Sequence, residues 1–136
     1  MKTLIIMAVA AVSMMGANAY AKQPSEKLLG ALIQVESSGN DKAIGDSGKA
    51  VGCLQIRKEV IKDVNRVYGT SYKMSDRTNR AKSKEICKKY ISIYATTKRL
   101  GRNVTNEDMA RIWNGGPNGY KKNATKKYWD KVANEI

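Results

Sequence analysis

Apolar residues recur at helical spacing along most of the chain. The first stripe belongs to a helix that opens at Pro24-Ser25-Glu26, ends at Ser37-Ser38-Gly39-Asn40, and carries Leu28, Leu29, Leu32 and Ile33. A second helix is expected from Gln55 to Tyr68, where the apolar positions are Ile56, Val60, Ile61, Val64 and Val67. The longest pattern runs from about Asp76 to Leu100, stops at Gly101, and is expected to turn inward Ala81, Ile86, Cys87, Tyr90, Ile91 and Tyr94.

Two shorter helices are expected in the C-terminal part, with a loop between them. Thr105-Asn106-Glu107-Asp108 is typical of an N-cap followed by acids in the first turn, and the helix that it opens carries Met109, Ile112 and Trp113. Asn114-Gly115-Gly116-Pro117-Asn118-Gly119 is too rich in Gly, Asn and Pro to hold a helix. The last helix, around Thr125 to Asn134, is expected to bury Tyr128, Trp129 and Val132.

Glycine also interrupts the pattern between the first two helices. Residues 44–52 include Gly45, Gly48 and Gly52, which is typical of a loop or a short hairpin. No repeat, low-complexity tract or linker divides the chain, so we expect one domain over residues 22–136. The predicted class is mainly α, with five or so helices and at most a small β-hairpin.

Residues 1–21 have the pattern of a secretory signal peptide. Lys2 supplies a positive charge, Leu4 to Met15 is almost unbroken apolar sequence, and Ala17-Asn18-Ala19 and Tyr20-Ala21 offer small-residue cleavage sites. An uncleaved membrane anchor is the less favoured alternative, because the apolar run is shorter than the ~20 residues that a spanning helix needs. We therefore expect a secreted or periplasmic protein with no stable insertion in the membrane.

The composition narrows the available chemistry. The 136 residues include no histidine and two cysteines. These counts exclude a Ser-His-Asp or Cys-His nucleophile pair, an HExxH zinc site, and four-cysteine zinc or iron–sulfur sites. We expect no cofactor and no metal, and a hydrolase of this composition has to use carboxylates.

The charge of the chain is strongly positive, with 25 Lys and Arg against 12 Asp and Glu, a net charge of +13. An exported protein this basic is drawn to polyanions such as cell-wall polymers, anionic lipid or nucleic acid. Its cations are spread along the chain in the manner of solvated helix faces, and phenylalanine is absent, which argues against a stacking platform for nucleic acid. We expect no specific nucleic-acid partner.

Cys53 and Cys87 form an even pair. In an oxidising compartment such a pair is expected to form a disulfide, which stabilises the protein by about 3 to 4 kcal/mol on the chain-entropy model. The alternative is two buried free thiols that behave as small apolar side chains.

Glu36 is poorly explained as a scaffold residue. It shares the apolar stripe of the first helix with Leu29, Leu32 and Ile33, and it lies in the last turn, where free carbonyl groups place negative charge. Burial and the helix terminus both raise the pKa of a carboxyl group, and a carboxylic acid still protonated near neutral pH can act as a general acid. The alternative is a Glu that bends out to water or pairs with a lysine.

A second carboxylate is needed if the reaction is glycoside cleavage by the usual pair of acids. Asp46 is the best candidate, because it lies in a polar Gly45-Asp46-Ser47-Gly48 turn whose free N–H groups favour the charged form. Asp41 is the rival. An Asp before Ser-Gly is also a common turn residue with no chemistry of its own.

Several stretches resemble the lysozyme-like superfamily. Val35-Glu36-Ser37-Ser38-Gly39-Asn40 and Val51-Gly52-Cys53-Leu54-Gln55-Ile56 are shared by lysozyme-fold glycosidases and, more distantly, lytic transglycosylases. The second half is similar to invertebrate-type (destabilase-like) lysozymes, through Tyr90-Ile91-Ser92-Ile93-Tyr94, the stretch from Ala110 to Gly119, and Tyr128-Trp129-Asp130-Lys131-Val132. The order and spacing match over about residues 28–133.

This resemblance implies an α+β lysozyme-like fold and a muramidase that cleaves the β-1,4 bond between N-acetylmuramic acid and N-acetylglucosamine in peptidoglycan. The acid of the family falls on Glu36, and its Asp falls on Asp46 if a gap is allowed in the loop. The chain departs from these lysozymes in two ways. It has only two cysteines, whereas they are usually rich in disulfides. It also has Trp113 where they commonly have His before Asn-Gly-Gly-Pro, which puts an isopeptidase side activity in doubt.

A sugar ring needs an aromatic face and several polar partners, which the loop from Trp113 to Tyr120 is able to supply. Gln55 either binds substrate or holds the loop of Asp46. The residues expected to bind substrate are Ser47, Gln55, Asn114, Gly115, Gly116 and Tyr120. Trp113 and Trp129 are better explained as core than as cleft residues, and Tyr128 is also taken as core.

Three functions remain open. The first is a secreted peptidoglycan hydrolase, monomeric, with peptidoglycan as substrate and a proteinaceous inhibitor as a candidate partner. The second is a lytic transglycosylase that uses Glu36 alone and leaves a 1,6-anhydro product. The third is a non-enzymatic basic protein that binds the cell wall or another polyanion.

Overall fold

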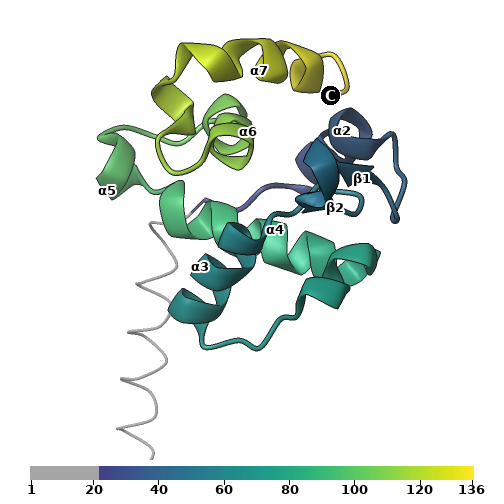
Figure 1. Cartoon of the computed structure of the whole chain (residues 1–136). Helices are drawn as coiled ribbons and strands as arrows, with labels where there is room; N and C mark the ends of the chain where they lie inside the picture. Colours follow the sequence, from purple (N-terminus) through teal and green to yellow (C-terminus); the bar gives the residue numbers. More distant parts are fainter. Residues whose placement is uncertain (1–21) are drawn as a thin grey trace, which may run out of the picture.

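The computed structural model describes residues 22–136, so the predicted signal peptide lies outside the described residues (Figure 1). This part of the chain folds into six α-helices and one two-stranded hairpin, which confirms the mainly α, lysozyme-like class. The helices are α2 (Glu26–Ser37), α3 (Lys58–Tyr68), α4 (Arg80–Tyr94), α5 (Thr97–Leu100), α6 (Asn106–Gly115) and α7 (Lys126–Ala133). Strands β1 (Ile44–Gly45) and β2 (Ala50–Val51) pair antiparallel, with Ile44 opposite Val51.

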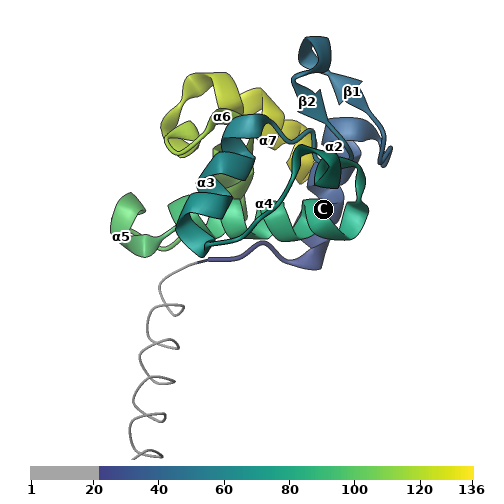
Figure 2. The ribbon, with the colours of Figure 1, turned by 60° about the horizontal axis from the view of Figure 1, so that its bottom comes forward.

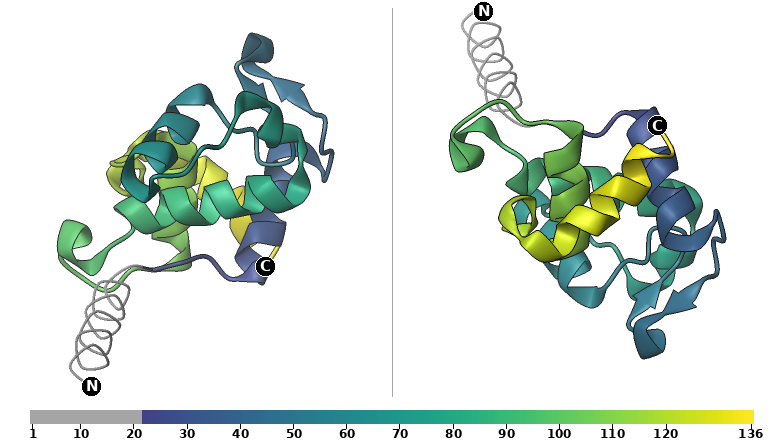
Figure 3. Two further views of the ribbon diagram at one scale, coloured as in Figure 1. Left: turned by 90° about the horizontal axis from the view of Figure 1, so that it is seen from below. Right: turned by 90° about the horizontal axis from the view of Figure 1, so that it is seen from above.

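Helix α2 contributes a row of side chains to the core. Leu28, Leu29 and Leu32 are fully buried in it, as their spacing predicts. Helix α7 runs across α2 and α6, α4 packs against both α3 and α6, and the hairpin projects from the body beside α2 (Figures 2 and 3). Within residues 22–136, no helix has the length and apolarity needed to cross a bilayer.

The predicted helix ends are formed by local hydrogen bonds. The Ser25 hydroxyl accepts a bond from the Leu28 N–H at 3.1 Å and caps α2, which ends at Ser38 in a left-handed conformation (φ 54°). Thr105 and Asp108 cap α6 reciprocally, as a capping box. These predicted ends are confirmed.

Two predicted helices are longer than the helices in the structure. Helix α3 begins at Lys58 and not at Gln55, because Gln55 has a positive φ (52°) and Ile56 pairs with Val51 in an antiparallel bridge. The helix expected from Asp76 to Leu100 is divided into a 3-10 turn (Met74–Thr78), α4 and α5. Asn79 caps α4 and Thr96 caps α5, and each is extended, so neither continues a helix.

One inward position of α4 was assigned wrongly. Ala81 is exposed, and Ser83 is buried in its place. Burial of Ser83 is tolerated because its hydroxyl donates to the Arg77 carbonyl oxygen at 2.9 Å. The apolar character of Ala81 alone therefore predicted the wrong inward-facing residue in the first turn of α4.

The expected disulfide is not formed in the structure. Cys53 and Cys87 are free thiols in the structure, and both are buried in the core. Burial raises the pKa of the Cys87 thiol well above its usual value, so the side chain stays uncharged. The two residues act as small apolar groups, which was the alternative interpretation.

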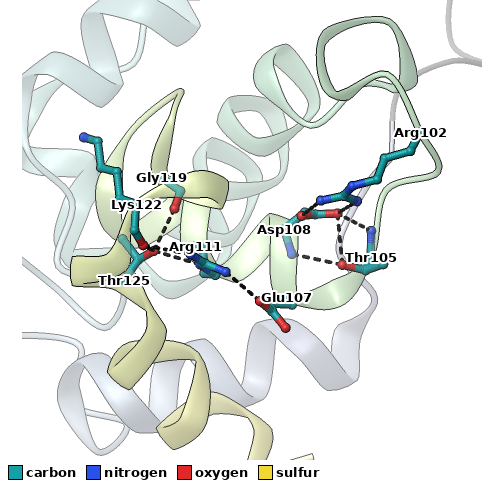
Figure 4. A network of polar contacts seen from close by, with 8 residues as sticks. All are labelled: Arg102, Thr105, Glu107, Asp108, Arg111, Gly119, Lys122 and Thr125. Carbon is teal, nitrogen blue, oxygen red and sulfur yellow. Dashed lines mark hydrogen bonds and ion pairs between the residues drawn. The ribbon is translucent and has the colours of Figure 1, made fainter.

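A network of polar contacts fixes α6 and the loop that follows it (Figure 4). Arg102 pairs with Asp108 at 2.6 Å, at the start of the helix. The buried Arg111 pairs with Glu107 at 2.6 Å and donates to the Thr125 hydroxyl at 2.8 Å and to the Lys122 carbonyl oxygen at 2.7 Å. The turn before α7 is thereby held against α6.

Candidate active site

A cavity of about 240 Å³ lies where the end of α2, the hairpin, the start of α3 and the end of α6 meet. Four of the residues that the sequence indicated line it, namely Glu36, Asp46, Gln55 and Asn114. The other lining residues are Ala50, Arg57, Val60 and Trp113. Residues far apart in the sequence therefore place two carboxyl groups at one hollow.

Glu36 lies in the last turn of α2 and is partly buried. Burial raises its pKa from 4.5 to about 7, although hydrogen bonds from Tyr128 and Trp113 and the positive charge of Arg57 oppose the rise. The Tyr128 hydroxyl donates to Oε2 of Glu36 at 3.0 Å. A carboxyl group in this environment is a proton donor near neutral pH.

The end of α2 is tied to the hairpin by hydrogen bonds. The Ser37 hydroxyl donates to the Cys53 carbonyl oxygen at 2.8 Å. The Gln55 amide donates to the carbonyl oxygens of Gly52 at 3.0 Å and Ala43 at 3.2 Å. A Cβ on residue 45 would lie 2.2 Å from Oε1 of Gln55, so a larger residue there would displace the end of the Gln55 side chain. Gln55 thus holds the loop that carries Asp46.

Asp46 lies in the 3-10 turn Asp46–Gly48, in a left-handed conformation (φ 49°). Its carboxylate pairs with the Arg57 guanidinium, and its side chain remains 49% exposed. The cavity thus has one partly buried carboxyl group and one solvated carboxylate, an asymmetry that suits an acid and a charged partner. The rival Asp41 pairs with Arg80 at 2.9 Å and does not line the cavity.

Four of the expected substrate-binding residues do not line the cavity. Ser47 is exposed beside Asp46, and Gly116 follows α6 with a φ of 87°. Gly115 packs against Thr125, whose Cγ2 would lie 2.5 Å from a Cβ at that position. Tyr120 packs against the core. Their binding of substrate stays a prediction.

Two residues at the site were missed. Tyr128 is partly buried against the core, as expected, but its hydroxyl reaches Glu36 from α7. The likeness of the Tyr128-Trp129 stretch to the lysozymes was the one signal that pointed to it. Arg57 had no such signal, since its role depends on the geometry of the hairpin. Trp113 is both a core residue and a cavity residue, because it packs edge-on against Tyr90, with ring centroids 5.7 Å apart, and also lines the cavity.

No cluster of His, Cys, Asp or Glu within residues 22–136 is able to hold a metal ion. The cavity contains two carboxyl groups, those of Glu36 and Asp46, in different environments. It permits one protonated group to donate to a leaving oxygen while a charged group faces the same space.

Comparison with known proteins agrees with the lysozyme-like fold. The family model "Transglycosylase SLT domain" matches residues 13–136. Among solved structures, Meretrix lusoria lysozyme in complex with Aeromonas hydrophila PliI is 28% identical, with a TM-score of 0.68 over 81% of this chain and 88% of that one. Tapes japonica lysozyme is also 28% identical, with a TM-score of 0.65 over 82% and 92%. No curated protein sequence matches the chain.

Proposed function

Since the chain belongs to the transglycosylase SLT domain family and has a lysozyme-like fold, we propose that it is a secreted muramidase acting on peptidoglycan. Residues 1–21 would be its signal peptide and residues 22–136 its catalytic domain. The observation that carries the proposal is Glu36, a partly buried carboxyl group with a pKa of about 7 in a cavity that also contains Asp46.

In this proposal Glu36 is the general acid. Its proton passes to the glycosidic oxygen between N-acetylmuramic acid and N-acetylglucosamine as the bond from that oxygen to the anomeric carbon breaks. The carboxylate that remains keeps the hydrogen bond from Tyr128, and the charge of Arg57 also stabilises it. The contacts that oppose the raised pKa therefore favour the state that follows proton transfer.

Asp46 is the second carboxylate. It faces the positive charge that develops on the sugar ring, and either attacks the anomeric carbon or directs a water molecule to it. Arg57 holds its carboxylate at the rim of the cavity. Water then supplies the hydroxyl group of the new reducing end.

A lytic transglycosylase is the second candidate. The description of the family model favours it, and so does the ion pair with Arg57, which occupies the carboxylate that a hydrolase would use. In that reaction a hydroxyl group of the muramic acid itself closes on the anomeric carbon, and Glu36 suffices. Mass analysis of digested cell walls separates the two, because reducing ends indicate the hydrolase and anhydro-muropeptides the transglycosylase.

The test of the acid is Glu36→Gln in a cell-wall turbidity assay. We expect lysis to fall by orders of magnitude while wall binding is retained, because the amide keeps the shape but has no acidic proton. Glu135→Gln is the control, since Glu135 is exposed and does not line the cavity. Full lysis by the Glu36 variant contradicts the proposal and favours a binding protein. Asp46→Asn is expected to give a smaller loss, and a silent Asp46→Asn favours the transglycosylase.

A proteinaceous inhibitor is proposed as a partner. The Meretrix lusoria lysozyme is in complex with PliI, and the cavity of this protein is partly open to solvent. Titration of the lytic activity with PliI tests this proposal. Lysis that is undiminished at excess PliI rejects it.

A further inference from the structure

A second cavity, of about 320 Å³, adjoins the first and shares Arg57 with it. It lies between the hairpin turn, the first turn of α3 and the 3-10 turn Met74–Thr78. Its lining contains four cations and one acid, together with Gly48 and Met74; the charged residues are Lys49, Arg57, Lys58, Arg77 and Glu59. The hollow therefore concentrates positive charge beside the candidate active site.

Most of this charge has no carboxylate partner. Arg57 pairs with Asp46, but no ion pair within residues 22–136 involves Lys49, Lys58 or Arg77. The Arg77 guanidinium donates to carbonyl oxygens only, those of Met74 at 2.9 Å, Ile56 at 3.1 Å and Lys49 at 3.3 Å. Unpaired cations around a concavity attract an anion more strongly than the same charges spread over a convex surface.

The cationic cavity is held in a fixed position relative to the active site. The Arg77 carbonyl oxygen lies so close to Gly52 that a Cβ on that glycine would be 1.8 Å from it. The bonds from Arg77 to Lys49 and Ile56 also join the Met74–Thr78 turn to the hairpin turn and to the segment that follows β2. A polymer bound at Glu36 therefore meets the cations of the second cavity at a defined distance along its length.

We propose that the cationic cavity binds a carboxylate carried by the glycan whose bond is cleaved at Glu36. This inference rests on the proposed function. Muramic acid carries a lactyl side chain that ends in a carboxyl group, which is either free or extended by a peptide with carboxylates of its own. Chitin has neither group. The cavity would thus favour glycans with acidic side chains over neutral ones of the same backbone.

The experiment measures binding without turnover, by NMR titration of the ¹⁵N-labelled protein. The probes are N-acetylmuramic acid, its dipeptide with one free carboxylate, and the methyl ester of each. We expect the free acids to shift the backbone amide signals of Lys49, Lys58 and Arg77, and the esters to leave them unmoved. Binding of N-acetylmuramic acid there assigns the lactyl carboxylate as the ligand, and binding of the dipeptide alone assigns the peptide carboxylate.

The double variant Lys49→Gln/Lys58→Gln is expected to raise the Kd of the acid at least about fivefold. Its control is Lys98→Gln/Lys131→Gln, which removes the same charge from exposed positions outside both cavities and should change the Kd less than about twofold. Equal losses in the two double variants, equal binding of acid and ester, or no binding of either acid would overturn the inference. If the inference fails but the protein still lyses cell walls, the proposed function stands. If the acids bind in the cationic cavity but the protein does not lyse cell walls, only the proposed function is refuted.

Discussion

Glu36→Gln is expected to stabilise the protein at pH 8 and to change its stability little at pH 4. Burial raises the pKa of Glu36 from 4.5 to about 7, so the folded state holds this proton more tightly than the unfolded state does. The free energy of unfolding therefore falls as the pH rises from about 4.5 through 7, because ionisation favours the unfolded chain. Glutamine never ionises, so the variant is free of this loss.

The size of the effect follows from the shift. A change from 4.5 to about 7, at 1.36 kcal/mol per pH unit, corresponds to roughly 3 kcal/mol once Glu36 is fully ionised. Partial exposure of the side chain reduces this figure, so we expect about 2 kcal/mol at pH 8. For a domain of this size, that gain corresponds to a rise in Tm on the order of 10 °C.

Urea unfolding at pH 4, 6 and 8 measures the effect for the wild type, Glu36→Gln and the exposed control Glu135→Gln. The chain has no histidine, so the titration of an imidazole does not contribute to the pH dependence in this interval. The curves of the wild type and Glu36→Gln should diverge above pH 5, while that of Glu135→Gln follows the wild type. Parallel curves for all three proteins would show that Glu36 ionises as an ordinary surface acid, which refutes the reasoning.

Three further outcomes are expected. Gly52→Ala should destabilise the fold by about 3 kcal/mol or more in urea unfolding, since its Cβ would meet the Arg77 carbonyl oxygen. Gly48→Ala is the control, because Gly48 has the same φ of 89° but open space around it, and it should lose about 1 kcal/mol. Equal losses of stability in the two variants would contradict this prediction. Tyr128→Phe removes a hydrogen bond that lowers the pKa of Glu36, so the alkaline limb of the lysis–pH profile should move to higher pH; a limb that stays in place rejects the contact. Binding to cell walls should weaken between about 0.05 M and about 0.5 M salt in a pelleting assay, and salt-independent binding would exclude an electrostatic attraction.

The elements that the sequence predicted correctly are those whose signals are local. Ser25 and Thr105 accept bonds from N–H groups three residues away, and Gly48 and Gly52 adopt positive φ values in the segment that the glycines marked as a turn. The division between α4 and α5 has a local cause too, but the cap at Thr96 was hidden in a long apolar pattern.

The candidate site was partly predictable for the same reason. Glu36 was found because its place on an apolar stripe is a property of one helix, and Asp46 because its turn is contiguous. The contact with Tyr128 spans 92 positions in the sequence, and the pairing of Asp46 with Arg57 depends on how the hairpin returns to α3. Neither contact has a periodic signature, so a single sequence does not reveal it.

The position of Tyr128 on the last helix has a consequence for the order of folding. The Tyr128 hydroxyl reaches Glu36 only when α7 packs against α2, and α7 is the last helix of the chain to be synthesised. A nascent or refolding chain in which α2 through α6 have assembled would contain the acid and the cavity but not their final geometry. Recovery of lysis during refolding should therefore not precede the docking of α7, which the change in tryptophan fluorescence measures.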